Sequence, residues 1–127
     1  MCIRDRLQIY QDIYSTGEAG EKIKEHSMLI STEKGLVLIT GCAHQGIAEI
    51  LEEIKETREQ SFYMILGGFH FKDMNIDEVN KNLKLMQKFQ VRHPAPCHCT
   101  GDNAIVKFYE EYGSAFIRIG VGRIIEV

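Results

Sequence analysis

The segment LVLITGCAHQGIAEILEEI, residues 36–54, decides the fold class because it joins a strand directly to a helix. Its first five residues are apolar or β-branched almost throughout, which is typical of a strand buried on both faces of a layered sheet. After His44, apolar residues recur with the i, i+3, i+4, i+7 spacing of one helical stripe, at Ile47, Ile50, Leu51 and Ile54. A histidine therefore lies at the turn between a buried strand and an amphipathic helix.

A second unit of the same kind follows. SFYMIL, residues 61–66, is another apolar run, and it leads through two glycines to His70. Asn75 and Glu78 have the spacing of a capping box, which predicts a helix that begins there and continues to about Gln90. Its expected buried stripe consists of Ile76, Val79, Leu83 and Met86.

The third unit is shorter. HPAPCH, residues 93–98, contains two prolines that cannot donate to a strand ladder, so we expect either an edge strand or a loop. Thr100 and Asp102 are candidate caps for a helix that ends near Gly113. Before the first unit, residues 26–32 and 36–40 predict a hairpin, and residues 116–127 predict two short strands.

Composition favours one α/β domain. The chain has 127 residues, 44% of them hydrophobic and 26% charged, with a net charge of -3 and no long block of either sign. This indicates neither a nucleic-acid nor a membrane partner, and the apolar runs are too short to cross a bilayer. We expect a cytoplasmic protein. The opening MCIRDR resembles translated adapter sequence, so we interpret residues 1–6 as a non-native leader and residues 7–127 as the domain.

The three histidine corners suggest a shared site. His44, His70 and His98 are separated by 26 and 28 residues, close to the length of one strand–helix–strand repeat. Because ligands of α/β sheets bind at the carboxyl ends of the strands, these imidazoles are expected at one edge. Imidazole is a common ligand of zinc and also suits iron. Hydrogen-bonded structural roles are the alternative, most of all for His70, which lies between two phenylalanines.

The cysteines offer a different chemistry. Four cysteines at this length do not indicate a disulfide framework, and reduced thiols are expected. Cys97 and Cys99 flank His98 and allow a redox site as a hypothesis. It ranks last, because Cys-x-Cys lacks the geometry of the familiar redox helix motif.

Three motifs, LVLITGCAHQGI, ILGGFHF and PCHCTGDNA, occur in an order and spacing that resemble the C-terminal half of metallo-β-lactamase-fold proteins. The resemblance is closest to the dihydropterin-methyl-ribofuranosylaminobenzene phosphate synthase branch. It implies an αββα sandwich and a divalent metal, zinc first, with iron or manganese as alternatives. By the same resemblance His44 and His98 are metal ligands, and His70 is a ligand or a substrate contact. Thr100 and Gly101 are candidate substrate contacts, through a hydroxyl and backbone N–H groups at a helix start.

One departure from the family pattern matters most. The defining cluster of the superfamily, His-x-His-x-Asp-His, is absent, since the chain has no His-x-His pair. We therefore expect a fragment of a hydrolase-like enzyme that is inactive alone and self-associates through an exposed apolar sheet face. In the whole enzyme, metal-activated water would act on a small phosphate or ester, with a pterin-related substrate implied. The alternative is a non-catalytic α/β module that binds a ligand or partner without metal.

Overall fold

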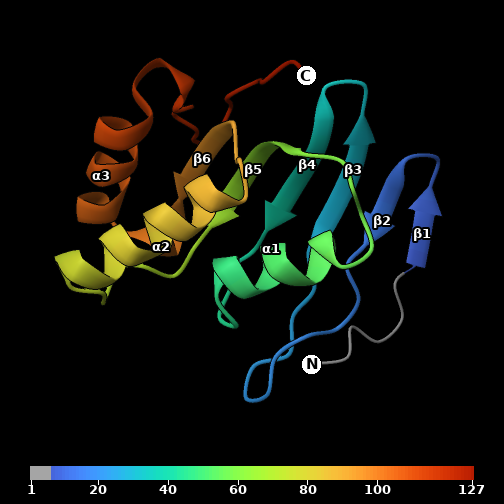
Figure 1. The fold of residues 1–127 in the computed structure, drawn as a ribbon, viewed down its shortest axis with the longest axis horizontal. Helices are drawn as coiled ribbons and strands as arrows, with labels where there is room; N and C mark the ends of the chain where they lie inside the picture. Colours follow the sequence, from blue (N-terminus) through green and yellow to red (C-terminus); the bar gives the residue numbers. More distant parts are fainter. Residues whose placement is uncertain (1–6) are drawn as a thin grey trace.

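The computed structural model describes residues 7–127, whose six strands form one sheet in the order β1-β2-β3-β4-β5-β6 (Figure 1). Neighbouring strands are antiparallel from β1 to β4, whereas β4, β5 and β6 run parallel. The interpretation of residues 1–6 as a leader lies outside the described residues. The strands are β1 (Leu7–Tyr10), β2 (Ile13–Ser15), β3 (Met28–Thr32), β4 (Gly35–Thr40), β5 (Phe62–Gly68) and β6 (His93–Cys97).

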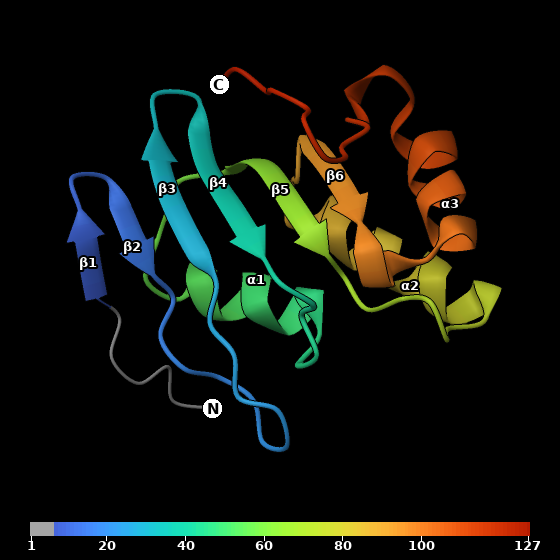
Figure 2. The ribbon, with the colours of Figure 1, turned by 180° about the vertical axis from the view of Figure 1, so that it is seen from behind.

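A helix follows each parallel strand, which confirms the three strand–corner–helix units. The α-helices are α1 (Ile47–Lys55), α2 (Ile76–Lys88) and α3 (Asp102–Tyr112), and the 3₁₀ turns are η1 (His98–Thr100) and η2 (Gly113–Ala115). Helices α1 and α2 lie next to each other behind the sheet, and α3 packs against β6 and α2 (Figure 2). The described chain is therefore an α/β layer with β6 at one edge of the sheet, as the prolines of β6 predict.

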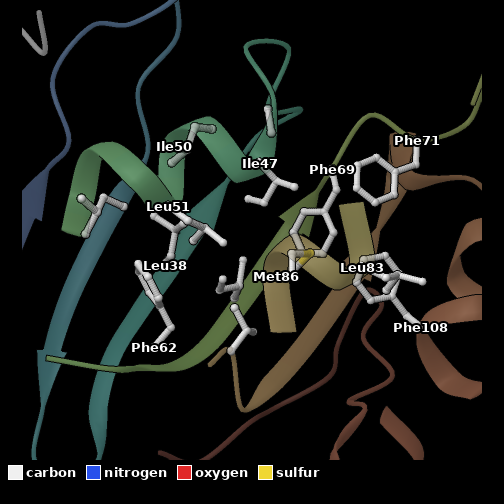
Figure 3. Packing of buried hydrophobic residues seen from close by; sticks show 14 of the residues in the cluster. Leu38, Ile47, Ile50, Leu51, Phe62, Phe69, Phe71, Leu83, Met86 and Phe108 are labelled. Atoms are coloured by element: carbon white, nitrogen blue, oxygen red, sulfur yellow. The ribbon is translucent and has the colours of Figure 1, made fainter. Parts of the chain in front are cut away.

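The core lies between the sheet and its helices (Figure 3). The predicted stripe of α1 is buried against inward-facing residues of β4 and β5, such as Leu38 and Ile65. Beside it, Phe69, Phe71 and Phe108 form an aromatic cluster in which the ring of Phe108 lies 5.5 Å and 5.9 Å from the other two, centroid to centroid. These three side chains hold the loop after β5 against α3.

Local signals explain where α2 begins. The Asn75 side chain accepts a hydrogen bond from the Glu78 N–H, and the Glu78 carboxylate accepts one from the Asn75 N–H, so the predicted capping box is confirmed. The predicted stripe is buried at Val79, Leu83 and Met86, but Ile76 is 51% exposed. Ile76 lies in the first turn of the helix, where a cavity opens in front of it instead of the core.

Two expectations about strands were incomplete or wrong. The two short strands predicted in residues 116–127 do not form, and this segment makes a single backbone hydrogen bond to β6, from Ile117 N–H to the Pro94 carbonyl. The prolines of β6 have no N–H to offer a seventh strand, which explains the difference. At the other end of the sheet, β1 and β2 form a further hairpin, which was not among the predicted elements.

The face of the sheet opposite α1 and α2 differs from the covered face. Within residues 7–127 no helix lies over the front of β3, β4 and β5 in Figure 2. Ile30, Ile39 and Leu66 alternate with core residues on these strands and are partly exposed. In the same part of the chain, no helix combines the length and apolar character needed to cross a bilayer.

Candidate functional site

The three predicted histidines lie at one edge of the sheet. The parallel register pairs Thr40 with Gly67 and Gly68 with Cys97, so β4, β5 and β6 end side by side. His44 lies in the turn between β4 and α1, His70 in the loop between β5 and α2, and His98 at the first position of η1. The structure therefore places all three corners at the edge where α/β proteins bind their ligands.

His44 and His70 come into direct contact. Their ring centroids are 4.7 Å apart and the ring planes are tilted by 51°. The Nδ1 atom of His44 lies 3.1 Å from Oε2 of Glu25, and the two side chains are 29% and 18% exposed. With Nδ1 engaged by the carboxylate, the remaining nitrogen of His44 can bind a ligand.

His70 has an unusual environment for a residue between two core phenylalanines. Its neighbours Phe69 and Phe71 are buried, whereas His70 itself is half-buried. The Nδ1 atom of His70 is buried and has no hydrogen-bond partner in the part of the chain that is described. A buried polar atom without a partner is costly, so this nitrogen is a candidate contact for a ligand.

His98 is presented differently from the other two. It is exposed and has a φ of 51°, in the left-handed region. Its corner is joined to the His70 corner through the backbone, because the Lys72 N–H donates to the Cys99 carbonyl at 3.1 Å. The structure therefore brings His44 and His70 into ring contact and leaves His98 on the adjacent corner.

Thr100 and Gly101 connect the same two corners. Thr100 is fully buried, and its Oγ1 accepts a hydrogen bond from the Phe69 N–H at 3.0 Å. The prediction that Thr100 caps the following helix is wrong: α3 begins after Gly101 without a side-chain cap, because the Thr100 hydroxyl is used across the loops. Gly101 has a φ of 82°, and a Cβ there would lie 2.8 Å from Lys72 Cα, so a larger residue would push the loops apart.

Two cavities border these corners. A cavity of about 590 Å³ is lined by Thr100 and Gly101 together with residues at the start of α2 and α3. A second cavity of about 510 Å³ is lined by His44, Gln45 and Glu49 and by residues 20–23 of the loop between β2 and β3. Both volumes lie in the range of small-molecule sites. The predicted substrate contacts and a predicted metal ligand thus each face a cavity.

The thiols are poorly suited to redox chemistry. Cys99 is buried, and its Sγ lies 3.6 Å from the Cys42 carbonyl oxygen, to which it donates. Burial raises the pKa of the Cys99 thiol, and a side-chain contact with Cys42 raises it further. Burial also raises the pKa of the Cys97 thiol. A raised pKa lowers the fraction of reactive thiolate at neutral pH, which argues against the redox hypothesis.

The residues present fit part of a metal site. In residues 7–127 there is no group of three or more His, Cys, Asp or Glu side chains placed to hold a metal ion. Catalytic zinc generally has three protein ligands. His44, with Nδ1 held by a carboxylate, and His70, with an unpartnered buried nitrogen, are nevertheless donors of a suitable kind. The ligand roles of His44, His70 and His98 stay predictions.

Two residues have roles that the sequence did not reveal. Glu25 contacts His44 from a loop 19 residues upstream, and no spacing rule links the two positions. His93 makes two contacts, because its Nδ1 donates to the Ala115 carbonyl at 2.9 Å and its ring packs edge-on against Tyr63. His93 is therefore a structural residue at the other end of β6.

Comparison with solved structures identifies the architecture. A crystal structure of a metal-dependent hydrolase of the β-lactamase superfamily superposes with a TM-score of 0.86 at 29% sequence identity, covering 99% of this chain and 57% of that one. The chain has a β-lactamase-superfamily fold. The resemblance inferred from the three histidine motifs is thereby confirmed. No protein-family model matches the chain.

Two curated proteins of Methanocaldococcus jannaschii are similar in sequence. The 7,8-dihydropterin-6-methyl-4-(beta-D-ribofuranosyl)-aminobenzene-5'-phosphate synthase is 35% identical over 103 residues, which is 80% of this chain and 35% of that protein. An uncharacterized protein is 31% identical over 121 residues, which is 95% of this chain and 44% of that protein. The chain thus spans less than half the length of these relatives and resembles the synthase branch that the motifs indicated.

Proposed function

We propose that this chain is part of a metal-dependent hydrolase-like enzyme and supplies one side of its active site. The observation that carries the proposal is the gathering of three histidine corners at the carboxyl ends of β4, β5 and β6. The superfamily fold supports it, because the structural neighbour is a metal-dependent hydrolase. As the chain contains no His-x-His-x-Asp-His cluster, we further propose that it is inactive alone.

In this proposal His44 and His98 are metal ligands, and His70 is a ligand or a substrate contact. Zinc is the first candidate, with iron and manganese as alternatives. When bound, such an ion would supply water or hydroxide at neutral pH for attack on a substrate. The chain's own contribution is to hold the imidazole of His44 with one nitrogen free and to present the buried nitrogen of His70 beside it.

The proposed substrate is a small phosphate or ester. The cavity beside Thr100 and Gly101 opens at the N-terminal ends of α2 and α3, where backbone N–H groups favour anionic oxygen. The sequence relative is a synthase whose name describes a pterin phosphate compound, which makes a pterin-related phosphate the specific candidate. A cytoplasmic location stays a prediction of the sequence.

The metal role is tested by titrating the purified chain with Zn²⁺ and measuring binding by calorimetry. We expect weak binding that is lost in His44→Ala and in His98→Ala. His93→Gln is the matched control, because His93 lies at the opposite end of β6 and has a structural hydrogen bond. Unchanged zinc affinity in both alanine variants would contradict the ligand assignment.

A non-catalytic α/β binding module is the second candidate. It is favoured by one observation, that the described side chains do not form a complete metal-binding group. This function predicts that a phosphate ester binds the chain with the same affinity whether Zn²⁺ or a chelator is added. The metalloenzyme proposal predicts that the chelator weakens binding of the same ester.

A further inference from the structure

We infer that Glu25 is a positioning residue that fixes the ring of His44 and keeps its distal nitrogen free for a ligand. The inference rests on the proposed function, in which His44 is a metal ligand. Glu25 lies in the loop between β2 and β3, outside the three strand–corner–helix units. The loop would thus contribute to the site although none of the histidine motifs lies in it.

Both carboxylate oxygens of Glu25 face the His44 corner. Oε2 lies 3.1 Å from Nδ1 of His44, and Oε1 accepts a longer hydrogen bond of 3.4 Å from the Gln45 N–H. The Glu25 side chain is only 18% exposed. A shielded carboxylate that contacts both the ring and the adjacent backbone holds the corner in one orientation more firmly than a solvated surface pair does.

The backbone of the loop is built to present this carboxylate. Glu25 and Ala19 exchange two hydrogen bonds, from Glu25 N–H at 2.9 Å and from Ala19 N–H at 2.8 Å. Closer to the sheet, the Thr16 N–H donates to the Ser27 carbonyl at 2.9 Å, and the Ser27 N–H donates to Thr16 Oγ1. Two sets of hydrogen bonds therefore close the loop, and Glu25 belongs to the set nearer the tip of the loop.

The chemical consequence concerns the tautomer of His44. A carboxylate accepts hydrogen bonds and cannot donate one, so the neutral imidazole has its proton on Nδ1 and a free lone pair on Nε2. Metal-binding histidines generally have a carboxylate or carbonyl on their other nitrogen. The same loop provides residues 20–23 as a wall of the cavity that His44 also lines.

The tautomer of His44 provides a direct test in the full chain without metal. At mildly alkaline pH, where imidazole is neutral, nitrogen-15 NMR of the ring is expected to show Nδ1–H in the wild-type protein and a shift towards Nε2–H in Glu25→Ala. Glu25→Gln is expected to retain Nδ1–H, because the amide oxygen still accepts. Glu21→Ala removes an exposed carboxylate of the same loop and is the control. It should leave the tautomer of His44 unchanged.

A second measurement is the affinity for Zn²⁺ alone. We expect Glu25→Ala to weaken zinc binding by about 10- to 100-fold, the usual effect of removing such a partner, and Glu25→Gln to weaken it less. A wild-type ring with Nε2–H, or a Glu25→Ala ring that stays Nδ1–H in a folded protein, would overturn the inference. If zinc does not bind at all while the tautomer changes as expected, the proposed function fails and the positioning role of Glu25 stands.

Discussion

Each of the three histidine corners contains a non-glycine residue in the left-handed backbone region. These residues are Ala43, His70 and His98, with φ values of 54°, 58° and 51°. This conformation costs a residue with a Cβ roughly 1–2 kcal/mol, and glycine does not have this cost. Such strain tends to gather at functional sites, where the surrounding structure holds it in place. The His98 side chain in particular is exposed, so its packing contributes little stability to offset this cost.

This predicts the effect of replacing His98. Because the side chain is exposed, His98→Gly should be more stable than His98→Ala by about 1 kcal/mol, and at least as stable as the wild type. Urea unfolding of the three proteins measures the differences. A large loss of stability in His98→Gly would show that the histidine serves the fold and would weaken its assignment as a ligand.

Thr100 is the opposite case, a buried polar residue that holds the corners together. Thr100→Val removes the acceptor of the buried Phe69 N–H, and should destabilise the protein by about 1–3 kcal/mol. Thr100→Ser retains the hydroxyl, so its free energy of unfolding should fall less than that of Thr100→Val. Equal stabilities of the valine and serine variants in urea unfolding would mean that this hydrogen bond contributes nothing.

The helices show which elements of the fold could be predicted from the sequence. Periodicity correctly predicted the three helices and their order, because each helix buries one stripe against the sheet, and the capping box correctly predicted the start of α2 alone. The loop that contains Glu25 has no periodic pattern of apolar residues. Its position depends on backbone hydrogen bonds between residues that come together only when the chain folds. The histidine corners were predictable from strand ends, but no pattern in the sequence indicates that the rings of His44 and His70 are in contact.

Helix α3 also contains a group that makes stability depend on pH. Burial, with a smaller contribution from the Glu111 carboxylate, raises the pKa of Tyr112 to about 12, and its Oη has no hydrogen-bond partner among the described residues. Since an unfolded tyrosine ionises near pH 10, the unfolded chain loses this proton first. Its contribution to stability is therefore complete below pH 10 and is lost as the pH rises towards about 12.

Tyr112→Phe should remove this loss of folding stability at alkaline pH. We expect its melting temperature to fall less than that of the wild type between mildly and strongly alkaline pH, with no penalty at neutral pH because no hydrogen bond is broken. Tyr109→Phe is the matched control, since Tyr109 lies on the same helix and is 62% exposed. Parallel pH profiles for the wild type and Tyr112→Phe would contradict the assignment.

For the whole molecule, the helix-free face of the sheet is the feature with the largest consequence. Ile30, Ile39 and Leu66 are partly exposed there, and Leu7, Ile9 and Tyr10 are exposed on the edge strand β1. The chain spans 57% of a solved relative of the same superfamily. Apolar surface of this kind, together with an unpaired strand edge, favours association with another chain.

We therefore expect the isolated chain to self-associate. Sedimentation velocity should show a mean mass that rises with concentration, because the apolar face becomes buried between copies. Replacing Ile39 and Leu66 with threonine should reduce the association, while Val106→Thr, on the outside of α3, should leave it unchanged. A monomer that melts sharply and independently of concentration would contradict this prediction.

We propose above all that histidines far apart in the sequence share one ion at the carboxyl edge of the sheet. Anomalous diffraction from crystals of the chain soaked in zinc tests it most directly. We expect a zinc peak within bonding distance of ring nitrogens of both His44 and His98, about 2.0–2.1 Å from each. A zinc ion bound elsewhere, or bound to only one of the two rings while the other faces away from it, would show that the two histidines do not share an ion.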